Sequence, residues 1–310
     1  MTVLVVGEAL VDVVGEATHV GGSPLNVAVG LSRLGQQTRL LTRYGRDEWG
    51  QLIDAQLRAN DVALVQQPDA GRTSSARVTL DDAGVASYDF DIDWTIEADV
   101  VGRAVDPGTR AVHTGSIATV LQPGADSVRQ IVEAARGRAL VTFDPNCRPT
   151  VMPDHAYAVA QAEAFVALSD VVKASDEDLA WLYPERTIEQ TLRAWVELGV
   201  SLAVATRGGD GALAVTRDAM AEVPGVSVAV ADTVGAGDSF MAALIDGLLH
   251  RVPAGADAAS ALEDLTTVEL ERLLSYSTRA AAITVSRPGA DPPRRSELDA
   301  VNGTEAAAIR

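Results

Sequence analysis

Short apolar runs alternate along this chain with longer segments in which apolar residues recur every three or four positions. The first run, residues 3–6, is rich in β-branched side chains and ends at Gly7, which predicts a buried strand. A helix is expected after it, with Ser23 as N-cap, Pro24 in the first turn and Gly35 at its end. Further strands are predicted at residues 39–42, 110–113, 140–143, 170–172 and 202–206, and a second helix at 51–60. Strands separated by helices predict an α/β fold, with a mainly parallel central sheet and helices on both faces.

Residues 73–94 break this alternation. Two strand-like segments, 77–80 and 85–90, flank the sequence Asp-Asp-Ala-Gly at 81–84, a pattern typical of a β-hairpin. Residues 11–20 are also strand-like, although polar positions interrupt them. Taken alone, the hairpin is consistent with a purely structural role, such as an edge hairpin.

The segment Asp-Thr-Val-Gly-Ala-Gly-Asp at 232–238 is the most informative in the chain. Val226, Val228 and Val230 alternate with smaller residues before it, which predicts a strand, and apolar residues at helical spacing follow it. Its glycines would point N–H groups outward at a helix N-terminus, where unpaired donors and the helix dipole attract an anion. Asp238 beside a bound phosphate would take a proton from an attacking hydroxyl. The segment therefore indicates phosphoryl transfer to an alcohol, with a tight strand-to-helix connection as the alternative.

Composition narrows the class of protein. A chain of 310 residues, 47% of them hydrophobic, fits one large α/β domain with a substantial core. A net charge of −18 argues against nucleic acid or an anionic membrane as the main partner. The lone cysteine, Cys147, excludes an internal disulfide, and no apolar run approaches the roughly 20 residues that span a bilayer. We therefore expect a soluble, cytoplasmic protein.

Two familiar nucleotide-binding patterns are missing from the sequence. The P-loop motif is absent, and Phe240 stands where the dinucleotide fingerprint needs its last glycine.

Residues 251–264 are expected to form an irregular or helical insertion, and the tail after residue 301 a frayed end.

Two motifs together resemble a known family. Residues 232–245 are similar to the C-terminal signature of the ribokinase-like, or PfkB-type, carbohydrate kinases. Residues 21–28, with Gly35 and Gly45 at later spacings, resemble that family's N-terminal signature. The resemblance covers roughly residues 2–290.

This resemblance implies one ribokinase-like kinase domain over residues 1–310, with a small β-sheet lid formed by about 11–20 and 73–94. The family transfers the γ-phosphoryl group of Mg·ATP to a primary hydroxyl of a small sugar. Some members also use a monovalent cation such as K⁺, and their exposed lid edges can pair two chains into a homodimer.

The resemblance makes Asp238 the catalytic base, and the N–H groups of Gly235, Ala236 and Gly237 would stabilise the transferred phosphoryl group. Other positions match the family's sugar site: Asp12, Gly21, Gly22 and Asn26. From the sequence alone, Asp12 would be a solvated turn residue and Asn26 an amide on a helix face.

Two further residues are candidates for the acceptor side. Phe90, in the expected lid, offers an aromatic wall over a neutral sugar. Arg148 follows a predicted strand with Asn146, at the sheet edge where α/β proteins bind ligands, and is a candidate phosphate clamp on the substrate side. An ion pair between Arg148 and Asp144 or a neighbouring carboxylate is the competing interpretation.

The nucleotide side departs from the family pattern at one place. Residues 172–178 resemble a strand-to-helix stretch where Asn and Glu, three apart, help to place Mg²⁺ and phosphates, but Ser175 and Asp178 stand there instead. Ser175 would lie by ATP and Asp178 would act on Mg²⁺ through a water, or the two would cap a helix. Lys173 would reach the phosphates, or would be a surface side chain.

The remaining candidates for the nucleotide and cation follow from resemblance. The loop after a predicted strand supplies Thr206, Arg207, Gly208 and Gly211, and is otherwise a hairpin turn. Ala281 would flank adenine. The positions matching the monovalent-cation site are Asp232, Thr284 and Gly289.

Substrate choice rests on what the motifs lack. Gly-Gly-Ser-Pro-Leu-Asn at 21–26 is closer to fructokinases and 2-keto-3-deoxygluconate kinases, and it supplies no basic partner for an existing phosphate. Arg77 and Arg103 are weak candidates for holding a sugar carboxylate. Fructose is therefore the first prediction, with 2-keto-3-deoxygluconate or another sugar or nucleoside as the alternative. A sugar or nucleotide sensor without activity is the alternative from a different class.

Overall fold

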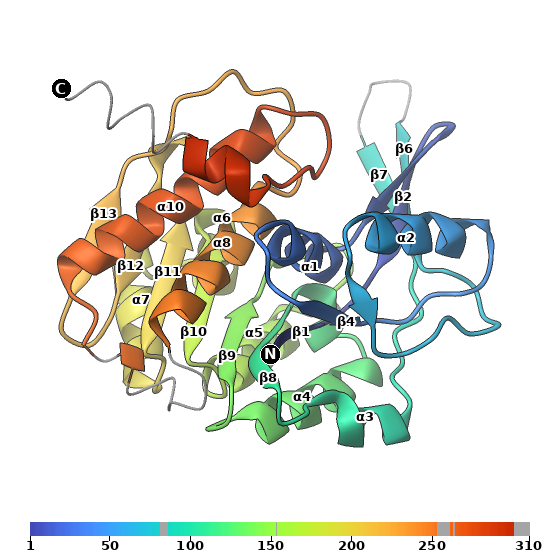
Figure 1. Ribbon diagram of the computed structural model, residues 1–310, viewed down its shortest axis with the longest axis horizontal. Coiled ribbons are helices and arrows are strands. Elements are labelled where there is room, and N and C mark those ends of the chain that lie inside the picture. The colour runs from blue at the N-terminus through green and yellow to red at the C-terminus, as the bar shows by residue number, and fades with distance from the viewer. Residues whose placement is uncertain (81–85, 153, 253–260, 263, 301–310) are drawn as a thin grey trace.

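A nine-stranded sheet forms the centre of the molecule (Figure 1). The computed structural model describes residues 1–310 except 81–85, 153, 253–260, 263 and 301–310. The strands, in spatial order, are β13 (Met220–Val223), β12 (Ala212–Val215), β11 (Leu202–Thr206), β10 (Val171–Ser175), β9 (Leu140–Asp144), β8 (Thr109–Gly115), β1 (Thr2–Val6), β4 (Thr38–Leu41) and β5 (Ala63–Leu64). From β11 to β5, each strand runs parallel to its neighbour. The exception is β12, which pairs antiparallel with both β11 and β13.

Helices cover both faces of this sheet, because side chains of a buried strand alternate between two cores. Val3 and Val5 of β1 enter one hydrophobic cluster, and Leu4 and Val6 enter the other. The first cluster is covered by α1 (Ser23–Arg33), α2 (Glu48–Ala59), α8 (Ala236–Arg251) and α10 (Thr267–Val285). The second is covered by α3 (Ala98–Ala104), α4 (Gly124–Ala135), α5 (His155–Val166), α6 (Asp176–Leu182) and α7 (Ile188–Glu197). The fold class predicted from the alternation is confirmed.

A second, four-stranded sheet projects from the main body beside α2 (Figure 1). Its order is β3 (Ala17–Gly21), β2 (Leu10–Val14), β6 (Ser75–Leu80) and β7 (Ala86–Asp91). None of these strands belongs to the main sheet, and the β6–β7 hairpin forms one edge of the small sheet. The expected turn at 81–84 lies outside the described residues, as do most of the 251–264 insertion and the tail.

The small sheet is anchored at its base by Arg43, which is buried. Its guanidinium forms ion pairs with Asp69 at 2.9 Å and Asp93 at 3.1 Å, on the segments that lead into β6 and out of β7. These contacts tie both connections of the β6–β7 hairpin to the main body.

Two local predictions are wrong. Residues 224–230, which the structure describes, form neither strand nor helix, and Val226, Val228 and Val230 are 45%, 36% and 64% exposed. Their alternation has no sheet to pair with, because β13 already ends the sheet at Val223. Ser23 is the first helical residue of α1 rather than its N-cap, since Gly22 takes the N-cap position and no side chain caps the helix.

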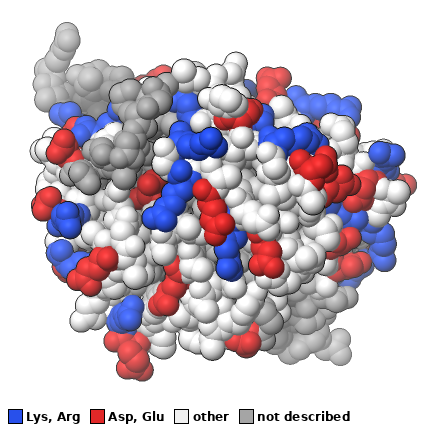
Figure 2. All heavy atoms as spheres, turned by 90° about the horizontal axis from the view of Figure 1, so that it is seen from below, with Lys and Arg blue, Asp and Glu red and all other residues white. Residues whose placement is uncertain are grey.

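The molecular surface carries both signs of charge. Figure 2 shows the face below the view of Figure 1, where Lys and Arg side chains are interspersed with Asp and Glu. Among the described helices, none has both the length and the apolar character that a membrane span requires.

Candidate active site

A cleft of about 1900 Å³ lies between the small sheet and the carboxyl ends of the parallel strands. It is lined by the ends of β1, β8, β9, β10 and β11, by the start of α1 and α8, and by residues of β2 and α10. Ligand pockets for one small molecule are typically about 300–1000 Å³. The cleft is therefore large enough for two substrates side by side.

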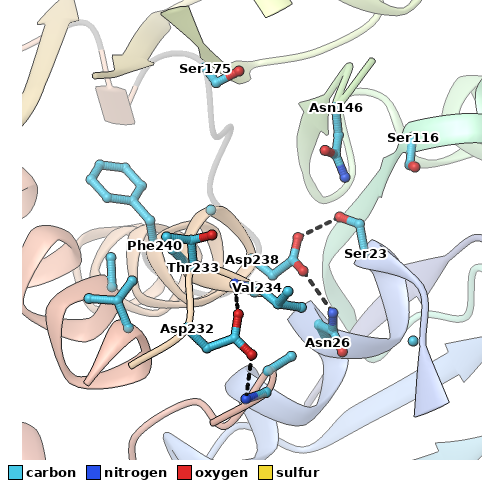
Figure 3. A pocket seen from close by; sticks show the side chains of 18 of the residues that line it. Ser23, Asn26, Ser116, Asn146, Ser175, Asp232, Thr233, Val234, Asp238 and Phe240 are labelled. Atoms are coloured by element: carbon cyan, nitrogen blue, oxygen red, sulfur yellow. Dashed lines mark hydrogen bonds between the residues drawn. The ribbon is translucent and has the colours of Figure 1, made fainter. Parts of the chain in front are cut away.

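The N-terminus of α8 faces this cleft (Figure 3). Gly235 is its N-cap, with φ 76°, and a Cβ there would lie 2.6 Å from Cβ of Ala290. Both the backbone conformation and the close approach therefore require glycine. Ala236, Gly237 and Asp238 form the first turn. The N–H of Ala236 donates to the carbonyl oxygen of Thr233 at 3.3 Å, whereas the N–H groups of Gly237 and Asp238 lie too early in the helix for an intrahelical acceptor. The predicted glycine turn before a helix is thus present, and it lines the cleft.

Asp238 is held in place by two residues from the start of α1 (Figure 3). Ser23 Oγ donates to Asp238 Oδ1 at 2.6 Å, and Asn26 Nδ2 donates to Oδ2 at 2.8 Å. The carboxylate is 9% exposed. Asn26 thereby uses its amide nitrogen on Asp238, whereas its Oδ1 has no hydrogen-bond partner among the described residues.

The sugar-side candidates lie together in the cleft. Asp12, on β2, packs its carboxylate against Gly21, where a Cβ would collide with it. Burial raises the pKa of Asp12, while His19 and Arg148 act in the opposite direction. Phe90 and Gly22 line the same part of the cleft.

Arg148 is exposed at the cleft and does not pair with Asp144. Its guanidinium donates to the carbonyl oxygen of Cys147 at 2.9 Å. Asp144 instead forms an ion pair with Lys173, so the competing interpretation of Arg148 is wrong.

Lys173 is buried beneath the first turn of α8, so the alternative of a surface side chain is wrong. Its Nζ lies 2.7 Å from Asp144 Oδ2, and would be 3.2 Å from a Cβ placed on Gly237. Burial lowers the pKa of Lys173, but the carboxylates of Asp144, Asp178 and Asp238 raise it above its ordinary value. The ammonium is therefore charged and lies next to the glycine turn at the start of α8.

Ser175 and Asp178 form a capping box at the start of α6. Asp178 Oδ2 accepts from the backbone N–H and the hydroxyl of Ser175, at 2.9 and 2.7 Å. Asp178 Oδ1 accepts from the N–H of Cys147 at 2.6 Å. Both carboxylate oxygens thus have donors within the protein. In the described part of the chain, no group of three or more His, Cys, Asp or Glu side chains could hold a metal ion.

The structure brings most nucleotide-side candidates to the cleft, but not all. The residues that line it are Lys173, Ser175, Asp178, Thr206, Gly208, Gly211, Asp232, Ala281 and Gly289. Arg207 instead forms an ion pair with Glu222 at 2.7 Å. Thr284 is buried and donates to Ser239 Oγ at 2.6 Å. Asp232 accepts from the N–H groups of Gly289 and Val234, at 2.8 and 3.0 Å.

Sequence reasoning missed Glu8, which lies just beyond β1 and lines the cleft although it is only 4% exposed. Its position directly after the first buried strand was the available signal. Burial raises the pKa of Glu8 from 4.5 to about 7, against the opposing effect of hydrogen bonds from backbone and Ser116.

This raised pKa predicts a pH-dependent stability difference. Between pH 4.5 and about 7 the folded protein keeps a proton on Glu8 that the unfolded chain has released, so Glu8 lowers stability as pH rises. The free energy of unfolding of Glu8→Gln, measured relative to that of wild type, is therefore expected to rise by about 2 kcal/mol from pH 5.5 to pH 8. Urea unfolding at the two pH values measures it. The exposed Glu133 of α4 supplies the control, since Glu133→Gln should show no such gain. An equal difference at both pH values would contradict the assignment.

The fold is ribokinase-like: a mainly parallel sheet with helices on both faces, a small second sheet beside its carboxyl edge, and an aspartate at a glycine-rich helix start in the cleft. Residues 3–297 match the model of the pfkB family of carbohydrate kinases. The chain belongs to this family and is a phosphotransferase that acts on a sugar.

Similar proteins include several fructokinases. The chain is 30% identical over 313 residues to fructokinase of Escherichia coli, covering 96% of this chain and 98% of that protein. It is 31% identical over 260 residues to fructokinase of Rhizobium leguminosarum bv. trifolii, covering 79% of each.

Solved structures share the fold over nearly the full length. Fructokinase from Xylella fastidiosa with bound ATP has a TM-score of 0.87 at 24% identity, covering 98% of this chain and 99% of that one. A double mutant of fructokinase from Vibrio cholerae O395, bound to fructose, ADP and potassium ion, has a TM-score of 0.80 at 28% identity, covering 96% and 97%.

Proposed function

We propose that this protein is a fructokinase that transfers the γ-phosphoryl group of ATP to the primary hydroxyl of fructose, giving fructose 6-phosphate. The observation that carries the proposal is Asp238, fixed by Ser23 and Asn26 beside the amides of the α8 N-terminus. Fructose is favoured because similar proteins are fructokinases, one of them bound to fructose.

The arrangement accounts for the chemistry in two parts. Asp238 accepts the proton of the sugar hydroxyl, late in a transition state that is loose and needs little help from a strong base. The first-turn amides and the Lys173 ammonium stabilise the charge on the phosphoryl group as it moves. Ser23 and Asn26 keep the carboxylate oriented toward the acceptor.

Part of the cleft lining suits a nucleotide. The exposed Val226 and Val228, together with Ala281, line the cleft and offer apolar surface for a base. Thr206, Gly208 and Gly211 lie at the end of β11, where the backbone can approach the ribose and phosphates.

Metal ions would be held mainly by the nucleotide. Since the Asp178 carboxylate has protein donors on both oxygens, its contact to Mg²⁺ would be indirect, through water. Mg²⁺ bound to the phosphates would neutralise their charge during transfer. Asp232 and Gly289, joined by a hydrogen bond at the cleft, are the candidates for positioning K⁺.

Coupled ADP release tests the proposal. We expect kcat/KM for fructose to exceed by about tenfold or more the values for ribose, 2-keto-3-deoxygluconate, fructose 1-phosphate, fructose 6-phosphate and nucleosides. Each acceptor is assayed with Mg·ATP, with and without K⁺. Higher efficiency with another acceptor would replace fructose in the proposal. Nucleotide binding without ADP release from any acceptor would instead support a sensor.

A further inference from the structure

Arg33, in the last turn of α1, contacts a segment far along the chain, residues 287–292, just after α10. Its guanidinium forms an ion pair with Asp291, 258 positions away, and also donates to the carbonyl oxygen of Pro292 at 2.6 Å. On its other side, Nε donates to Asn60 Oδ1 at 2.7 Å. Three acceptors thus hold one side chain that is only 18% exposed, and this side chain ties the 287–292 segment to α1.

The 287–292 segment packs on the start of α8. Ala290 lies so close to Gly235, the N-cap of α8, that a Cβ on this glycine would come within 2.6 Å of the alanine Cβ. Next to it, the N–H of Gly289 donates to Asp232 Oδ2 at 2.8 Å (Figure 3). The position of the α8 N-terminus therefore depends on where this segment lies.

The first turn of α8 consequently has two separate supports, one from each end of α1. Asp238 is held by two hydrogen bonds from the start of α1. Gly235 is held by Ala290, on the segment that Arg33 ties to the last turn of α1. In the proposed reaction the first support orients the carboxylate toward the sugar hydroxyl. The second support positions the backbone amides that face the phosphoryl group.

Contacts that do not involve Arg33 also join α1 and α8. A Cβ on Gly30 would lie 2.7 Å from the Cβ of Ala242, so the two helices are in close contact at this point. Both helices also contribute buried side chains to the same hydrophobic cluster. They should therefore stay packed when Arg33 is changed, and the 287–292 segment is the part that is released from α1.

We propose that Arg33 is a positioning residue for the phosphoryl-donor side of the site. Through Asp291 and Pro292 it holds the 287–292 segment against Gly235, and thereby fixes the first-turn amides of α8 relative to the donor nucleotide. The proposal rests on the proposed function with ATP as the donor, but it does not depend on fructose being the acceptor.

Arg33→Met tests this role, because it keeps an apolar side chain of similar length and removes the guanidinium. We expect kcat/KM for ATP to fall about tenfold or more, since a small displacement of a positioning group is costly in rate. KM for the sugar at saturating ATP should stay within about twofold of wild type, because Asp238 keeps both of its donors. A side chain needed only for stability would not separate the two substrates in this way.

Arg33→Lys gives a graded comparison. It keeps the charge beside Asp291 but cannot reach all three acceptors at once, so its loss in kcat/KM for ATP should be smaller than in Arg33→Met. If Arg33→Met does not fold, Arg33→Lys takes its place, with the constant for ATP again expected to change and the constant for the sugar expected to stay.

Arg39→Met is the matched control. Arg39 forms an ion pair with Asp106 at 3.0 Å, and the two side chains are 19% and 42% exposed, against 18% and 42% for Arg33 and Asp291. Like Arg33, it also donates to a backbone carbonyl, that of Ala104, at 3.1 Å. Neither Arg39 nor its two partners line the cleft. Urea unfolding should therefore show a similar loss of stability, with all kinetic constants within about twofold of wild type.

A double variant separates positioning from charge. Arg33→Met leaves Asp291 without this partner, and because Asp291 lines the cleft, its carboxylate would also repel a nucleotide. In Arg33→Met, Asp291→Asn that charge is gone but the tie is still broken, so the loss in kcat/KM for ATP should persist. Recovery of the wild-type value would show that repulsion was the cause, and would overturn the positioning role.

Two other results would overturn it: an unchanged kcat/KM for ATP in Arg33→Met, or an equal loss in Arg39→Met. In both cases an active wild type leaves the proposed function intact. A wild-type protein that releases no ADP with any acceptor would instead refute the proposed function, and the role of Arg33 with it. If wild type prefers another sugar, only the fructose assignment fails, and the same variants are compared with that sugar.

Discussion

Asp238→Ala is expected to lower kcat by about 10² to 10⁴, the usual scale for loss of a general base, while sugar affinity changes little. The reason lies in the placement of the carboxylate, which Ser23 and Asn26 hold at 2.6 and 2.8 Å beside the first turn of α8. Steady-state ADP release gives kcat, and isothermal titration with the sugar gives affinity separately.

Ser23→Ala provides a graded comparison for this result. It leaves Asp238 in place with one of its two donors, so the loss in kcat should be much smaller than in Asp238→Ala. Near wild-type turnover in Asp238→Ala would remove Asp238 from the chemistry. Equal losses in both variants would mean that orientation, rather than proton transfer, is what Asp238 contributes.

Lys173→Met is expected to reduce both stability and activity. It leaves Asp144 buried without the ammonium that lies 2.7 Å away, and breaking a buried ion pair in this way costs about 3–5 kcal/mol. It also removes the positive charge beneath Gly237. Because that charge would stabilise the phosphoryl group, kcat/KM for ATP should fall by about 10² to 10³. Urea unfolding and ADP release measure the two effects.

The double variant Lys173→Met, Asp144→Asn separates these effects. With no charge left unpaired, it should recover much of the lost stability, since an uncompensated buried carboxylate is the main source of the loss. Its activity should stay low because the ammonium is still missing. Recovery of both quantities would show that Lys173 acts only in folding.

The fold could be predicted from the sequence because its signals are local. Buried β-branched runs and the helices between them are read from neighbouring residues, and the main sheet follows from their alternation. The valines at 226, 228 and 230 show the limit of this reasoning. Period-two spacing indicates a strand only if another strand is there to pair with it, and the spacing itself carries no information about that neighbour.

The site was predictable in its backbone and less so in its side chains. Gly235 and Asp238 were located correctly because a glycine turn before a helix is a local motif. Ser23 was expected to cap its own helix, but it donates instead to a residue 215 positions away. For Lys173, the sequence allowed either a contact to the phosphates or a place on the surface. The structure places it in a buried ion pair with Asp144.

The sequence by itself determined the α/β class, the glycine turn and the carboxylate at the start of α8, since each depends on conformational preferences of adjacent residues. Only the tertiary structure decided which groups meet in the cleft. Ser23 and Asn26 reach Asp238, and Glu8, Ser116 and Asn146 become neighbours, because parallel strands bring distant segments to one edge. Hydrogen bonds and charges act over a few ångströms of space, whatever the separation along the chain.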